Sequence, residues 1–125
     1  MFDSEIKKAN EYLKEQLWMD FEMCKACGGE LELYGYLDEA GEDKIKIIFE
    51  FPYMVSCNFF FTYEGEHKSF ISSVDGEEAY QINKKYGVTQ GNTVFKISNV
   101  GAEADMIIVA KGIKVIITDA GYACD

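Results

Sequence analysis

The spacing of apolar and polar residues divides the chain into a helix, a strand-rich stretch, a second helix and a final group of strands. In the first segment, charged residues separate apolar side chains at Phe2, Ile6, Ala9, Leu13 and Leu17. This spacing of three to four residues predicts an amphipathic helix over about 3–19, capped by Asp3 or Ser4. A second helix is predicted over about 76–86, because acidic residues open it and Gly87 favours a left-handed stop.

Alternation of apolar and polar residues predicts strands in the remaining segments. The runs 31–37 and 45–51 flank an acidic turn and predict an antiparallel hairpin, whose core face carries Leu31, Leu33, Leu37, Ile45, Ile47, Phe49 and Phe51. After the break at Pro52, alternation predicts a strand with one face formed by Tyr53, Val55, Cys57, Phe59, Phe61 and Tyr63. Further strands are predicted near 70–71, 93–99, 105–110 and 113–118. The last two are almost wholly apolar, so we expect them at the centre of the sheet, covered on both faces.

Together these elements predict an α+β fold in a single domain over residues 1–125. We expect two helices packed on a mainly antiparallel sheet of six or seven strands. A chain of 125 residues, 48% of them hydrophobic, has the composition of a globular domain. No apolar run approaches the ~20 residues of a membrane helix, so we expect no membrane association.

The charge of the chain is strongly negative and unevenly distributed. The net charge is −10, and residues 1–43 contribute twelve acidic residues against four lysines. Every basic residue is a lysine, so the chain lacks the guanidinium forks that grip phosphates and base edges. The negative field repels polyanions, which argues against nucleic-acid binding and favours a basic protein partner.

Cys24-Lys-Ala-Cys27-Gly-Gly has the spacing of half a zinc ribbon and predicts a tight turn. A complete site would need two further ligands from Cys57, His67 and Cys124, which stand far apart in the sequence. We therefore expect no cofactor, and keep a zinc-stabilised or redox-responsive domain built on Cys24 and Cys27 as an alternative. The charged amphipathic N-terminus does not resemble an export signal, so we expect a cytoplasmic protein with reduced thiols.

The sequence contains no recognisable catalytic constellation. His67 lies in a charged turn without a nucleophile at a defined spacing, and no zinc-protease or phosphate-binding glycine motif occurs. The acidic turn 38–43 lacks the ligand spacing of an EF-hand calcium loop. We therefore expect a non-enzymatic protein.

Tyrosines beside carboxylates form the candidate partner-binding surface. If the leucines of 31–37 face the core, Tyr34 and Tyr36 face outward, where they can serve as rigid anchors while acidic groups steer a basic partner. The candidate residues are Glu30, Glu32, Tyr34, Tyr36, Asp38, Glu39, Glu42 and Asp43. Coverage of the tyrosines by the second helix or a neighbouring strand is the alternative.

The order of these segments resembles small bacterial immunity-type proteins of polymorphic or contact-dependent toxin systems. The resemblance rests on a helix, then Trp18-x-Asp20-Phe21, a hairpin ending in Ile48-Phe-Glu-Phe51, and a closing pair of apolar strands. It implies a small cytoplasmic protein without catalytic residues that binds and inhibits a cognate toxin or nuclease. A homo-oligomer in which Phe59-Phe-Phe61 meets its counterpart across subunits is a further alternative, because the sequence does not specify the oligomeric state.

Overall fold

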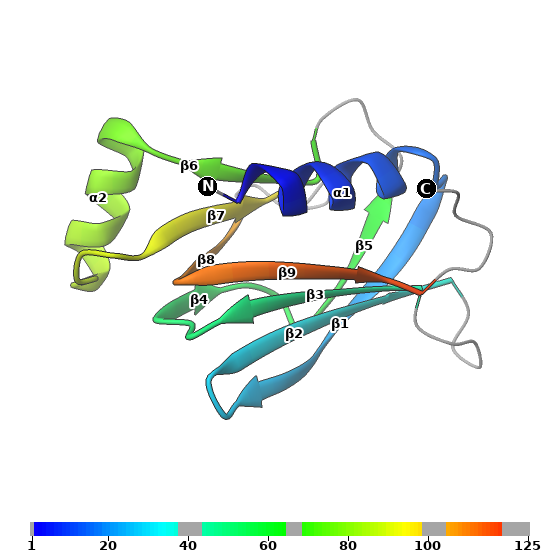
Figure 1. Cartoon of the computed structure of the whole chain (residues 1–125), viewed down its shortest axis with the longest axis horizontal. Helices are drawn as coiled ribbons and strands as arrows, with labels where there is room; N and C mark the ends of the chain where they lie inside the picture. Colours follow the sequence, from blue (N-terminus) through cyan, green and yellow to red (C-terminus); the bar gives the residue numbers. More distant parts are fainter. Residues whose placement is uncertain (1, 38–43, 65–68, 99–104, 119–125) are drawn as a thin grey trace.

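The computed structural model describes residues 2–37, 44–64, 69–98 and 105–118, and these form two helices and nine strands (Figure 1). The elements are α1 (Asp3–Lys14), β1 (Trp18–Cys27), β2 (Glu30–Tyr36), β3 (Ile45–Glu50), β4 (Met54–Ser56), β5 (Phe60–Glu64), β6 (Ile71–Val74), α2 (Gly76–Tyr86), β7 (Thr93–Ile97), β8 (Met106–Ala110) and β9 (Gly112–Ile117). The predicted α+β class, the two helices and the antiparallel pairing are confirmed.

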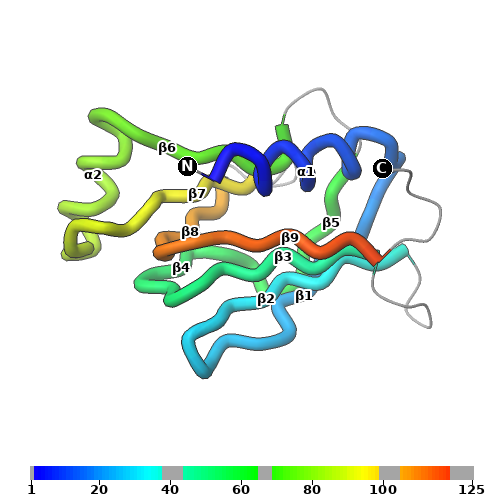
Figure 2. The backbone as a smooth tube through the Cα atoms, in the orientation of Figure 1, coloured from blue at the N-terminus to red at the C-terminus, as the bar shows by residue number. Residues whose placement is uncertain are grey.

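The strands pair into two antiparallel sheets, whereas the sequence predicted one sheet of six or seven strands. One sheet has the order β5-β1-β2-β3-β9, and the other has the order β4-β8-β7-β6. The chain enters the second sheet through residues 51–53, where Phe51 has a left-handed φ of 48° and Pro52 cannot donate to a ladder. It returns to the first sheet to form β5, crosses again to form β6, and returns finally at Lys111, between β8 and β9; this path can be followed in Figure 2.

Stacked aromatic rings join the two sheets in a shared core. The ring of Phe21, from β1, stacks on Phe61 of β5 and on Phe70, which precedes β6, with centroid distances of 5.3 and 4.9 Å. Phe49 of β3 packs against Phe95 of β7 at 5.4 Å. All five rings are almost completely buried, so a single apolar cluster holds both sheets together.

Helix α1 lies across the gap between the two sheets and binds an edge strand of each (Figure 1). On β9, the N–H of Val115 donates to Glu5 Oε1 at 2.8 Å, and Lys8 Nζ donates to the carbonyl of Val115 at 3.0 Å. On β6, Asn10 Nδ2 donates to the carbonyl of Ile71 at 2.8 Å, and the Ile71 N–H donates to Asn10 Oδ1 at 3.0 Å. Side chains of α1 thus replace a neighbouring strand at both edges.

The helices differ from their predictions at several points. Helix α1 ends at Lys14 instead of residue 19, because the chain must extend into β1; Leu17 is left 88% exposed. No side-chain hydrogen bond caps α1, whose N-cap residue is Phe2. Helix α2 has the predicted bounds and ends at Gly87 with a φ of 64°, but none of its residues is buried.

Several strand residues also lie elsewhere than predicted. Phe51 is 65% exposed, because the chain leaves the first sheet at that point. The single strand predicted after Pro52 is broken into β4 and β5, which belong to different sheets and leave Tyr53, Val55 and Phe59 exposed. Strand β9, expected at the centre of a sheet, lies at an edge covered by α1.

Candidate partner-binding surface

The outer face of the five-stranded sheet, on the side away from the shared core, carries both candidate tyrosines. Tyr34 and Tyr36 alternate with the buried leucines of β2, and they lie opposite Glu22 and Asp20 of β1. Neither described helix covers this face (Figure 1). We define the outer face by the outward side chains of its five strands, Trp18, Asp20, Glu22, Lys25, Glu30, Glu32, Tyr34, Tyr36, Lys46, Ile48, Glu50, Phe60, Thr62, Glu64, Lys114 and Ile116.

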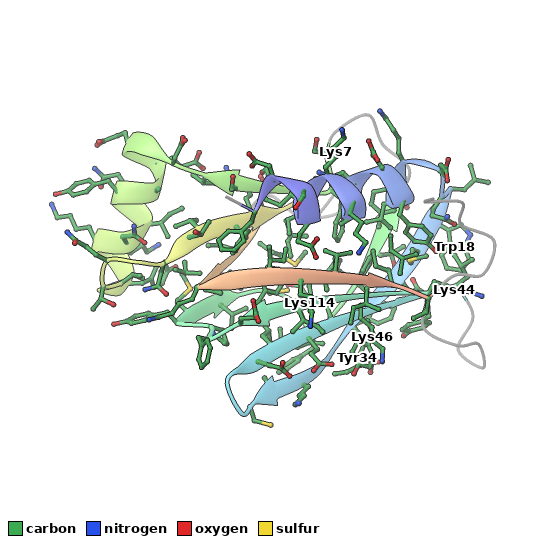
Figure 3. The ribbon with its side chains drawn as sticks, in the orientation of Figure 1. Lys7, Trp18, Tyr34, Lys44, Lys46 and Lys114 are labelled. Atoms are coloured by element: carbon green, nitrogen blue, oxygen red, sulfur yellow. The ribbon has the colours of Figure 1, made fainter. Side chains whose placement is uncertain are left out.

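A polar network fixes Tyr34 in place. Its hydroxyl donates to Glu32 Oε1 at 2.6 Å, and Lys46 Nζ lies 5.0 Å from the centre of its ring. Lys25 forms ion pairs with Glu30 at 3.2 Å and Glu32 at 3.7 Å. Figure 3 shows Tyr34 and Lys46 together, on the opposite side of the molecule from Lys7 of α1. The tyrosine is therefore held in one orientation before any partner arrives.

Glu32 is the centre of this network and is only 8% exposed. The hydrogen bond from Tyr34 lowers the pKa of the Glu32 carboxyl below its ordinary value of 4.5, although burial acts in the opposite direction. The pKa of Lys25 is raised above its ordinary value, chiefly by the hydrogen bond that Lys25 donates to Glu30. Both shifts favour the charged forms, so the network is intact at neutral pH.

Replacing Tyr34→Phe should lower the free energy of unfolding by about 1 kcal/mol at pH 7, because a hydrogen bond to a carboxylate is lost. Since the pKa of Glu32 is lowered on folding, this contribution is fully present above pH 4.5 and disappears as the pH falls through the folded-state pKa. Urea unfolding at pH 7, 5 and 3 measures the difference, with Tyr86→Phe on α2 as the control. A difference that does not change with pH would exclude Glu32 as the partner.

Charge is unevenly distributed over the outer face. On β3 and β9, Lys46 and Lys114 lie on the same face as Tyr34 (Figure 3), and Glu50 ends β3. Carboxylates occupy β1 and β5, where Asp20, Glu22 and Glu64 lie together. Lys25 offsets one of the two negative charges of Glu30 and Glu32, so most of the unpaired negative charge lies on β1 and β5, beside the tyrosines.

Trp18 and Phe60 are surface aromatics that the sequence reasoning did not include in the site. Trp18 is 43% exposed on β1 opposite Glu64, and Phe60 is 53% exposed on β5 opposite Glu22. Alternation of polar and apolar residues along 18–23 could have revealed β1 and its outward Trp18. Of the other predicted residues, Asp38, Glu39, Glu42 and Asp43 lie outside the described residues.

The cysteine pair lies on an extended strand, which corrects the predicted tight turn. Cys24 is the extra residue of an irregularity between Met23 and Lys25, Cys27 ends β1, and the turn follows at Gly28 and Gly29. Both cysteines are exposed.

The further ligands that zinc would need are not gathered around this pair in the described part of the chain. Cys57 is half-buried, with its Sγ 3.3 Å from the Sδ of Met106, and burial raises its pKa to about 11. His67 and Cys124 lie outside the described residues. Within the residues that are described, no three His, Cys, Asp or Glu side chains form a group that could hold a metal ion.

Among the residues placed by the structure, neither helix has the length and apolar character needed to cross a membrane. Comparison of the chain with models of protein families, with curated proteins and with solved structures found no match.

Proposed function

We propose that this chain is a non-enzymatic binding protein of the bacterial cytoplasm, an immunity-type inhibitor that covers a basic toxin or nuclease with the outer face. The observation that carries this proposal is the anchoring of Tyr34 on a sheet face that neither described helix covers. A tyrosine whose orientation is already fixed loses little conformational freedom on binding, and tyrosines are frequent among the residues that dominate interface energies.

Charge supports a basic partner. Asp20, Glu22 and Glu64 lie on one half of the outer face, and the whole chain carries a net charge of −10. Such a field accelerates the encounter with a positively charged protein more than it strengthens the final complex. The association rate should therefore fall steeply as salt is added, while the dissociation rate changes little.

Capture of partners from lysate of the source cells tests the proposal when three baits are compared. The wild-type chain and the Tyr80→Ala/Tyr86→Ala variant, whose exposed tyrosines lie on α2, should retain the same basic protein. The Tyr34→Ala/Tyr36→Ala variant should lose it while keeping the circular dichroism spectrum of the wild type. Equal retention by all three baits would contradict the assignment of the outer face.

A further inference from the structure

Four of the described strands form the edges of the two sheets, and their outward backbone groups are not equally covered. Side chains of α1 bind the backbone of β9 and of β6, as described above, and β4 is only three residues long. The remaining edge is β5, five residues long. Resting on the function proposed above, we propose that a strand of the basic partner, with basic and apolar residues in alternation, adds to the sheet along β5.

The hydrogen-bond pattern shows which groups of β5 are available. Met23 N–H donates to the carbonyl of Phe59 at 2.8 Å, and these two residues lie opposite each other in the ladder between β1 and β5. Bonded pairs alternate along an antiparallel ladder, so the backbone groups of Phe61 and Tyr63 face β1. Those of Phe60, Thr62 and Glu64 therefore point to the open edge.

No hydrogen bond within the described part of the chain reaches these outward groups. Three N–H groups and three carbonyls in a row form the template that an incoming strand requires. The edge of β6 makes the contrast clear, because Ile71 has the same outward direction there and both of its backbone groups are bound by Asn10.

Side chains beside the edge determine which strand fits. Phe59 and Phe60 are 76% and 53% exposed, and they offer apolar surface where the edge begins. On the outer face, the edge is flanked by Glu22 opposite Phe60, by Asp20 opposite Thr62, and by Glu64 itself. On the core face, Phe61 and Tyr63 are almost completely buried and pack against Phe70, so this side of the edge is apolar. A strand with basic residues outward and apolar residues inward complements both faces.

A second copy of this chain fits the edge less well than a basic strand. Two copies would bring together two chains of net charge −10, and pairing of two five-residue strands gives a small contact compared with the ~1,200 Å² of a stable interface. The edge also continues into the outer face, since Phe60, Glu22 and Tyr34 follow one another across three neighbouring strands. One partner can therefore engage both surfaces.

Hydrogen–deuterium exchange of the full chain, resolved by residue with NMR, tests this proposal with a synthetic probe. The probe is the acetylated and amidated peptide Lys-Val-Lys-Val-Lys-Val-Lys, and its control replaces every lysine with glutamate. At about five times its Kd, the lysine peptide should slow exchange at Phe60, Thr62 and Glu64 about sixfold, while the glutamate peptide leaves it unchanged. Protection confined to the outer-face residues of β2, β3 and β9, protection confined to α1 and β6, or no protection at all would overturn the proposal. So would protection that rises with protein concentration alone, because a second copy would then occupy the edge.

Substitutions at Thr62 separate backbone pairing from side-chain contacts. Thr62→Pro removes an outward N–H that the ladder to β1 does not use, and should weaken the lysine peptide at least about tenfold. Thr62→Val removes only the bond from Thr62 Oγ1 to Asp20 and should retain binding. Ser73→Pro, at the outward position of β6, is the matched edge control and should also retain binding. Equal affinity of all three variants would contradict strand addition at β5.

A variant of the peptide keeps the test valid if Thr62→Pro does not fold. Methylation of the amide nitrogens that face β5 should abolish binding to the wild-type chain, whereas methylation of the alternate nitrogens should not. The same binding by both methylated peptides would overturn strand addition. Failure of the peptide to bind at β5 can be distinguished from failure of the proposed function. The proposed function is tested separately, by capture of the basic protein with the wild-type chain and the tyrosine variants.

Discussion

Phe21→Ala is expected to lower the free energy of unfolding by about 3–5 kcal/mol, which is the range for removal of a buried phenylalanine ring. Phe21 is completely buried and stacks on both Phe61 and Phe70, so its ring fills the junction between the two sheets. Domains of this size have a total stability of only about 5–15 kcal/mol. The variant should therefore unfold at a much lower urea concentration, as measured by circular dichroism.

Phe59→Ala is the matched control for this experiment. Its ring is 76% exposed, and the expected change is within about 0.5 kcal/mol. If the two substitutions had equal effects, Phe21 would not join the sheets as the structure describes.

Asn10→Ala is expected to cost at least about 2 kcal/mol, because one side chain satisfies two backbone groups of Ile71 and each orphaned group costs about 1–3 kcal/mol. The same substitution should accelerate hydrogen exchange at the Ile71 amide, since its acceptor is removed. Urea unfolding and residue-resolved exchange measure the two effects separately.

Asn83→Ala is the control, because the Oδ1 of Asn83 is buried without a hydrogen-bond partner among the described residues. Alanine at that position removes an unsatisfied group from a helix and should not destabilise the protein. A similar result for both asparagines would mean that α1 does not hold the edge of β6.

Local patterns in the sequence predicted much of the fold. Alternation in 31–37 and 45–51 placed β2 and β3 correctly except at Phe51, which lies beyond β3, and Gly87 marked the end of α2. Strand β1 was missed because a cysteine pair with two following glycines resembles a metal-binding turn, although the turn begins only at Gly28. The division of the strands into two sheets could not be predicted either, because alternation specifies the two faces of a strand and not the strands beside it.

The candidate surface was predicted only in part for the same reason. Alternation with buried leucines indicated that Tyr34 and Tyr36 share a face with Glu30 and Glu32, and the structure places them so. The lysines of this surface could not be predicted, because no local pattern specifies the register of the strands that carry them. Lys25 of β1 pairs with Glu32, and Lys46 of β3 lies over the ring of Tyr34. Gly35 occupies a core position where alternation would favour a larger residue, because Met19 and Ile45 fill the space above it.

The affinity of the captured basic protein for wild-type and Tyr34→Ala/Tyr36→Ala chains tests the central claim most directly. With the Tyr80→Ala/Tyr86→Ala variant as reference, surface plasmon resonance should show a Kd at least about 30-fold weaker for the outer-face variant, as expected when central anchors are removed. The reference variant should bind like the wild type. Identical Kd values for all three chains would contradict a partner-binding role for the outer face.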